Sequence, residues 1–268
     1  DAAKGIGIVA SNGGHILDYE GVDRVAVPMP PLICIPTTCG TSADVSQFAI
    51  INNTRGRVKI AIVSKALVPD ASLIDPVTLS TLDAYTTAAT GIDALVHAIE
   101  AVVSNAASPL TDLHAMQALR LLQRHLPTAV AEAQNVEARG GVMLASLEAG
   151  LAFSNASLGC VHALAHSLGG YLDLPHGECN ALLLSHVVGF NYGSAGARYR
   201  EVGEVFGVDF RGLDEAEGRR RLCAQLAGYR ESLGIAGGLR QRWLTEAELP
   251  VLAAKAINDP CNATNPRR

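Results

Sequence analysis

The residues with the clearest chemical potential are an aspartate and a set of histidines. Asp93 and His97 stand four apart in a segment rich in alanine, leucine, valine and isoleucine. His162 and His166 stand four apart in a second such segment, and His176 follows after a glycine pair and a Leu-Pro step. Residues four apart lie on one face of an α-helix, one turn from each other, so each pair can contribute to a single site.

Four of these residues, Asp93, His97, His162 and His176, describe a divalent-metal site. Three neutral imidazoles and one carboxylate suit Fe²⁺, Zn²⁺ or a similar cation better than Ca²⁺ or Mg²⁺, which prefer oxygen ligands. A single histidine on an apolar helix is more often a hydrogen-bonded core residue. The aspartate favours the metal, because a buried, unpaired carboxylate costs several kcal/mol or more and needs a cation or a full set of donors.

Three stretches of the chain resemble signatures of the iron-containing (type III) alcohol dehydrogenases. Residues 88–101 (AATGIDALVHAIEA) and 162–170 (HALAHSLGG), the latter followed by 175–177 (PHG), are similar to the two metal signatures of that family. Residues 35–45 (IPTTCGTSADV) are similar to its nicotinamide-side loop. The likeness runs almost from end to end, and it is strongest to the branch that contains 1,3-propanediol dehydrogenase, lactaldehyde reductase and NAD-dependent methanol dehydrogenase.

The resemblance implies a metal-dependent alcohol dehydrogenase that transfers hydride between a short-chain primary alcohol or diol and a nicotinamide cofactor. It implies Fe²⁺ as the metal, with Zn²⁺ or another divalent cation as alternatives, and NAD as the cofactor, with NADP left open. The family places the residue that matches His166 beside the nicotinamide and the substrate, where an imidazole can help to transfer protons. A packing role is the alternative for His166.

The resemblance also assigns residues to the dinucleotide. They comprise the last residues of a segment that contacts the pyrophosphate and the threonines of the nicotinamide-side loop. A serine where the family usually has threonine and a lysine that reaches the ribose complete the set. In chain order these are Asp1, Lys4, Thr37, Thr38, Thr41, Ser46 and Lys59. The glycines that precede the aspartate in the family are absent, so we expect a piece of a longer protein. Without the resemblance, a Thr-Thr pair before a glycine is a common turn pattern and an isolated lysine is usually solvated.

Composition indicates a soluble intracellular enzyme. At 268 residues and 49% hydrophobic, the chain can form one large or two ordinary domains. A net charge of −5 without a basic run gives no support for nucleic-acid or acidic-membrane binding. We find no charged leader and no uninterrupted apolar segment of bilayer length, and we interpret the six scattered cysteines as reduced thiols. We therefore expect a cytoplasmic homo-oligomer whose partner is a small alcohol or aldehyde.

The character of the chain changes near residue 80. Before it, short β-branched runs alternate with turns, and we predict strands at 31–36, 46–52, 58–64 and 72–75. After it, alanine and leucine patterns predict helices at 110–126, 137–153 and 213–233. The helix that carries His162 should fray at the pair Gly169-Gly170.

The predicted fold class is therefore α/β plus all-α. A partial Rossmann-like dinucleotide-binding domain, residues 1–80, precedes a helical metal-binding and catalytic domain, residues 81–268. The resemblance gives this arrangement a dehydroquinate synthase-like architecture.

Three alternatives remain open. The glycerol dehydrogenase and sugar-phosphate cyclase branches share the two-domain plan but commonly hold zinc with three ligands, whereas this chain offers four ligand positions. A metallohydrolase is disfavoured, because no His-Glu-x-x-His is present to supply a general base. A non-catalytic regulatory relative of the same fold would also retain the ligands. Glu100 is either support for an imidazole or a solvated side chain, and the sequence does not decide between them.

Overall fold

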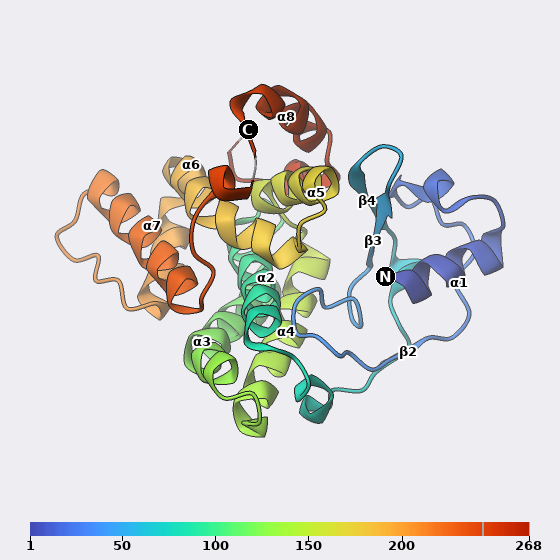
Figure 1. Ribbon diagram of the computed structural model, residues 1–268, viewed down its shortest axis with the longest axis horizontal. Coiled ribbons are helices and arrows are strands. Elements are labelled where there is room, and N and C mark those ends of the chain that lie inside the picture. Colours follow the sequence, from blue (N-terminus) through green and yellow to red (C-terminus); the bar gives the residue numbers. More distant parts are fainter. Residues whose placement is uncertain (243, 268) are drawn as a thin grey trace.

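The protein, described here by a computed structural model over residues 1–242 and 244–267, divides its apolar side chains between two clusters. The smaller cluster packs α1 (Ala2–Asn12) against β3 (Phe48–Asn53) and β4 (Val58–Val63). The larger cluster joins the helices that follow residue 83. In Figure 1 the strands and α1 lie on one side of the molecule and the helices on the other. Two clusters accord with a domain division near residue 80, which stays a prediction.

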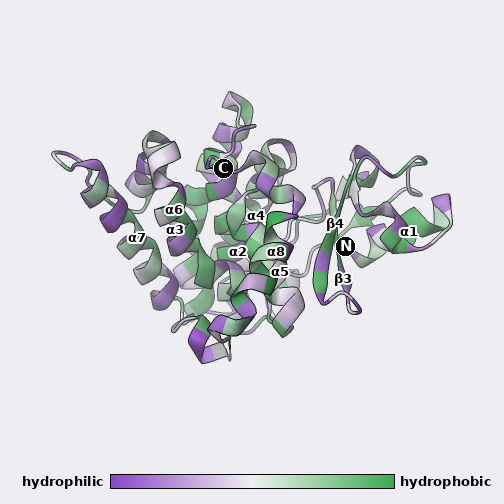
Figure 2. Cartoon of the chain, turned by 90° about the horizontal axis from the view of Figure 1, so that it is seen from above, coloured by the Kyte–Doolittle hydropathy of each residue, from purple (hydrophilic) through white to green (hydrophobic). Residues whose placement is uncertain are grey.

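The helical part is built around α2 (Ala84–Val103), which packs against α3, α4 and α6. Asp83 caps its start by accepting a hydrogen bond from Thr86 N. Figure 2 shows hydrophobic residues gathered where the helices meet. The other helices are α3 (Pro109–Ala131), α4 (Val136–Ala156), α5 (Cys160–Leu172), α6 (His176–Val205), α7 (Glu215–Ser232) and α8 (Leu249–Ile257). The predicted helices at 110–126, 137–153 and 213–233 correspond to α3, α4 and α7.

The strands form two small sheets. β3 and β4 pair antiparallel, and β1 (Gly21–Val22) adds to β4 in parallel. β2 (Ile33–Cys34) and β5 (Ala71–Ser72) pair in parallel over two residues each. The two longer strands therefore lie within one residue or two of their predicted bounds. The strands predicted at 31–36 and 72–75 are much shorter, because each pairs over two residues only.

Helix α5 continues through the glycines where we expected it to fray. It ends at Leu172, and Asp173 adopts a left-handed conformation with φ 55°. A Cβ placed on Gly170 would lie 2.5 Å from Val58 Cα, which is closer than atoms can approach. The glycine is therefore a contact point that allows α5 to lie against β4, and this contact holds the helix together beyond the glycine pair.

Helix α2 is long and apolar enough to cross a membrane, and α4 with α5 would pass the same test only as a pair bent by 105°. In the most apolar window of α2, however, 89% of the residues are buried inside the protein. A core helix has the same length and composition, so this criterion gives only weak evidence for a membrane span.

The contact at Gly170 makes a testable prediction. Gly170→Ala should destabilise the protein by about 1–3 kcal/mol, because the added methyl group must push α5 away from β4. Gly228→Ala is the matched control, since this helical glycine of α7 has no heavy atom within 4 Å of an added Cβ. The control should be stabilised by roughly 0.5–1 kcal/mol. Chemical denaturation of both variants measures the difference, and equal stabilisation would contradict a tight contact.

Candidate metal and cofactor site

A cavity of about 340 Å³ lies between the β3–β4 hairpin and the helices. It is lined by all four predicted metal ligands and by His166, which come from three helices. Side chains of the predicted cofactor group line it as well. These are Asp1, Thr41, Ser46 and Lys59. Residues from six widely separated parts of the sequence therefore meet at one cavity.

Three of the predicted ligands place their donor atoms together. One carboxylate oxygen of Asp93 and one ring nitrogen each of His162 and His176 lie within 4.8 Å of one another. Asp93 Oδ1 is 3.6 Å from Nε2 of His162 and 3.6 Å from Nε2 of His176. Two imidazoles and one carboxylate form a donor set that suits Fe²⁺.

His97 lies beside this group. Its ring stacks on that of His162 at 4.5 Å and on that of Phe153 at 4.2 Å. Its Nδ1 lies 3.2 Å from the carbonyl oxygen of Gly40, to which it can donate, so Nε2 keeps its lone pair. The role of His97 as the fourth ligand stays a prediction.

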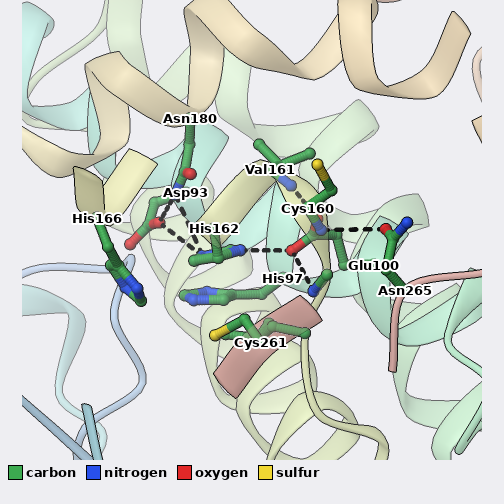
Figure 3. Close-up of polar contacts among 12 residues, drawn as sticks. Asp93, His97, Glu100, Cys160, Val161, His162, His166, Asn180, Cys261 and Asn265 are labelled. Atoms are coloured by element: carbon green, nitrogen blue, oxygen red, sulfur yellow. Dashed lines mark hydrogen bonds and ion pairs between the residues drawn. The ribbon is translucent and has the colours of Figure 1, made fainter. Parts of the chain in front are cut away.

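Glu100 supports His162, which answers the question that the sequence left open. Its carboxylate is 4% exposed and accepts from His162 Nδ1 at 2.7 Å, from Gly159 N at 3.0 Å and from Val161 N at 2.7 Å. Figure 3 shows Glu100 and Asp93 on opposite sides of the His162 ring. With Nδ1 bound to Glu100, Nε2 is left to face Asp93, as a ligand imidazole requires.

The charges of the site depend on one another. Burial alone would raise the pKa of Asp93, but His97, His176 and His162 outweigh it and hold that pKa well below its usual range. Burial lowers the pKa of His97 to about 3 and that of His176 well below its ordinary value. Burial also acts on His162, but its hydrogen bonds with Asp93 and Glu100 are stronger and raise its pKa to about 9.

The donor set fits a divalent cation. Asp93 is buried and its low pKa keeps it ionised, and the Nε2 atoms of His162 and His176 both lie 3.6 Å from its Oδ1. A cation would balance the carboxylate and use the free lone pairs of the imidazoles.

His166 has a different partner. Its Nδ1 donates to Asp259 Oδ2 at 2.8 Å, and the other oxygen of Asp259 accepts from Cys261 N at 2.9 Å. The ring of His166 stacks on that of His176, with centroids 5.2 Å apart. His166 is therefore oriented by a carboxylate beyond α8, which the sequence analysis did not identify.

The predicted cofactor residues are divided between two cavities. Thr37 and Thr38 line a second cavity of about 320 Å³, together with Lys4. Asp1 and Thr41 line both cavities, so the two adjoin one another. An elongated ligand could therefore extend from the loop at Thr37 towards the metal ligands.

Lys4 has a structural task in addition to its place in the second cavity. Its ammonium group is 1% exposed and donates to the carbonyl oxygens of Ser46 at 2.6 Å and Phe48 at 2.9 Å. These bonds fasten α1 to the start of β3. Burial lowers the pKa of Lys4 to about 8. A direct contact of Lys4 with the cofactor stays a prediction.

The comparisons with known proteins agree with this geometry. Residues 1–76 match the family "Iron-containing alcohol dehydrogenase", and residues 87–268 match "Fe-containing alcohol dehydrogenase family, C-terminal". The 1,3-propanediol dehydrogenase of Klebsiella pneumoniae is 41% identical over 268 residues, which are 100% of this chain and 69% of that protein. The NAD-dependent methanol dehydrogenase of Bacillus methanolicus is 39% identical, with coverage of 100% and 70%.

A solved structure extends the agreement to the fold. The crystal structure of a 1,3-propanediol oxidoreductase superposes with a TM-score of 0.93 at 40% identity, covering 99% of this chain and 69% of the other. The fold and the site thus define a class of protein in which a nucleotide-binding part is joined to a helical metal-binding part. The chain belongs to the iron-containing alcohol dehydrogenase family. It is an oxidoreductase acting on alcohols, with Fe²⁺ and NAD as cofactors, and the predicted family and fold class are confirmed.

The metal ligands can be tested by elemental analysis. Wild-type protein should hold about one divalent ion per chain, and His176→Ala should hold much less, because it loses one of three clustered donor atoms. His186→Ala is the matched control, since His186 is an exposed histidine of the same helix. Equal metal content in His176→Ala and in the control would remove His176 from the site.

Metal binding should also release a proton. In the metal-free protein the pKa of His162 is raised to about 9, so His162 is protonated at neutral pH. An imidazole that binds a metal must be neutral. The apparent affinity should therefore rise by about tenfold per pH unit from neutral pH up to about pH 9 and then level off. Calorimetry in buffers of different ionisation enthalpy measures the protons released. An affinity that does not change over this range would contradict an imidazolium at His162.

Proposed function

We propose that this protein oxidises short-chain primary alcohols or diols with NAD⁺ and reduces the corresponding aldehydes in the cytoplasm, as a homo-oligomer. The single observation that carries the proposal is the shared cavity, which brings metal ligands, a histidine and cofactor-side residues together. The printed names of the relatives support the substrate class, since they act on propanediol and methanol.

Each group of residues has a task in this proposal. Asp93, His97, His162 and His176 would hold the divalent cation, which lowers the pKa of the substrate hydroxyl and polarises the carbonyl in the reverse direction. Since His166 Nδ1 donates to Asp259, its Nε2 is the nitrogen that can take up or give a proton in the cavity.

The cofactor-side residues line the same cavity. Ser46 and Lys59 would hold the part of the dinucleotide nearest the metal, and Thr37, Thr38 and Thr41 the part in the adjoining cavity. Bound in this way, the nicotinamide would supply or accept the hydride that is exchanged with the carbinol carbon.

The dimensions of the cavity support a small substrate. Its volume of about 340 Å³ has to accommodate the reacting end of the cofactor as well as the alcohol. Phe48, Ile50, Phe153 and Leu158 give it an apolar wall, against which a short carbon chain can pack. One methylene is worth about 1–3 kcal/mol in such a pocket, so chain length should change turnover measurably.

A substrate screen tests the proposal. Fe²⁺-loaded protein should reduce NAD⁺ with at least one of ethanol, methanol, 1,3-propanediol and 1,2-propanediol, and NADP⁺ and ethanolamine should be tested in parallel. Absorbance of the reduced nicotinamide measures turnover. If the metal is bound and none of these alcohols is oxidised, the non-catalytic regulatory role is supported instead. Activity that requires Zn²⁺ and glycerol would support a glycerol dehydrogenase-like enzyme.

The separate task of His166 makes a further prediction. His166→Ala should keep its metal and lose about 10²–10⁴-fold in turnover, because it removes a proton-transferring group and no ligand. His162→Ala should lose both metal and turnover. Metal content and steady-state rates should be measured on the same preparations. Full activity of His166→Ala with every good substrate would show that this histidine only packs against its neighbours.

A further inference from the structure

Asn265 is a buried residue whose side chain uses all of its hydrogen-bonding capacity inside the protein. Its amide oxygen Oδ1 accepts from Cys160 N at 3.1 Å and from Asn191 Nδ2 at 2.9 Å. Its amide nitrogen Nδ2 donates to Asn191 Oδ1 at 3.0 Å and to the carbonyl oxygen of Arg267 at 2.6 Å. Two lone pairs and two hydrogens are the whole capacity of an amide. At 5% exposure, Asn265 is thus a fully bonded junction.

The junction reaches the three helices that carry the predicted metal ligands. Cys160 is the first residue of α5, and Asn191 lies on α6. The backbone carbonyl oxygen of Asn265 accepts from Asn105 Nδ2 at 2.7 Å, and Asn105 follows the last residue of α2 by two positions. All four predicted ligands lie on these three helices. One residue therefore bonds to every part of the chain that brings a ligand to the site.

Helix α5 depends on this junction because it has no capping side chain of its own. The first N–H groups of a helix have no partner within the helix, and a cap usually supplies one. Gly159 precedes α5 and cannot do so. Glu100 accepts from Gly159 N and from Val161 N. Asn265 accepts from Cys160 N, which lies between them. The start of α5 is thus capped by two residues from elsewhere in the sequence.

The two capping oxygens approach α5 at one point. A Cβ on Gly159 would lie 2.9 Å from Asn265 Oδ1 and 3.0 Å from Glu100 Oε1. Figure 3 shows the Asn265 side chain directed at the start of α5. His162 follows Cys160 by two residues, so the position of its ring depends on where these oxygens hold the first turn.

A metal site requires this kind of control. Its donor atoms must be held to within about 0.5 Å of their working positions. Hydrogen bonds inside one helix cannot fix the separation of donors that lie on three different helices. We propose that Asn265 is a positioning residue of the metal site, because it fixes the separations of the three helices that carry the predicted ligands. The inference rests on the proposed metal site.

The segment that contains Asn265 also reaches the histidine proposed to transfer protons. Asp259 lies six residues before Asn265 and accepts from His166 Nδ1 at 2.8 Å. Residues 259–267 therefore bond to α5 twice, at its first turn and at His166. A displacement of this segment should disturb the metal ligands and the proton-transferring group together.

Cobalt substitution tests the proposal, because the visible absorption of Co²⁺ depends on the arrangement of its ligands. Asn265→Leu keeps the approximate shape of the side chain but none of its hydrogen bonds. Its affinity for Co²⁺ should fall at least about tenfold, and its spectrum should change. Asn12→Leu is the matched control, because this partly buried asparagine bonds to Ile8 and Val27 near the end of α1 instead. The control should keep the wild-type spectrum and affinity.

A measurement on the wild type covers the case in which Asn265→Leu does not fold. Coupling between two sites is reciprocal, so if the bonds of Asn265 strengthen metal binding, the metal must strengthen those bonds. Saturating Co²⁺ should therefore slow hydrogen exchange in residues 260–267 more than in residues 8–27, which include the control asparagine. Mass spectrometry of peptide fragments measures the difference.

The possible outcomes are distinct. A folded Asn265→Leu with the wild-type spectrum and affinity would overturn the proposal and leave Asn265 with a purely structural role. Where that variant does not fold, equal slowing of exchange in residues 260–267 and 8–27 would do the same. An equal loss of affinity in Asn12→Leu would also contradict it, because any loss of stability would then weaken the site. Failure of the wild type to bind Co²⁺ would instead refute the metal site itself.

Discussion

The buried carboxylate of Asp93 is the constraint on which the rest of the site depends. It lies in α2, an apolar helix in which 16 of the 20 residues are buried. An ion in such surroundings needs compensating charge or donors from every direction. The neighbouring imidazoles and the amide of Asn180 supply part of this compensation, and a divalent cation would supply the rest. The positions of three helices are therefore linked to the charge balance of one residue.

Close backbone contacts make this arrangement possible. Gly177 allows the start of α6 to touch α2, and Gly40 allows the loop after β2 to lie against Asp93, since an added Cβ there would be 3.0 Å from Asp93 Oδ2. The same Gly40 accepts a hydrogen bond from His97. These glycines thus determine how closely the neighbouring backbone approaches the site, while polar partners such as Glu100 orient the ligand rings.

Local patterns in the sequence were sufficient to predict the longer elements and to single out the residues of the candidate metal site, whose role as ligands stays a prediction. The spacing of Asp93 and His97 is a helical repeat, and the start of α3 at Ser108 and Pro109 follows from capping chemistry. Periodicity also gave β3 and β4 nearly correct bounds.

Contacts between distant parts of the chain could not be predicted in this way. Asp259 orients His166 across 93 residues, and no local pattern connects them. Lys4 resembled a cofactor residue, and only the fold shows that its ammonium donates to the carbonyls of Ser46 and Phe48, at the start of β3. The helix α5 passes its glycine pair because β4 packs against it, which is a tertiary effect that local propensity does not contain.

The most direct test of the central claim is the effect of metal on unfolding in wild type and in Asp93→Asn, which has the same shape without the charge. If the Asp93 carboxylate holds the cation, saturating Co²⁺ or Zn²⁺ should stabilise the wild type, by about 2.7 kcal/mol at a hundredfold excess over the dissociation constant. Asp93→Asn should gain much less. Equal stabilisation of both proteins by the metal would contradict the account.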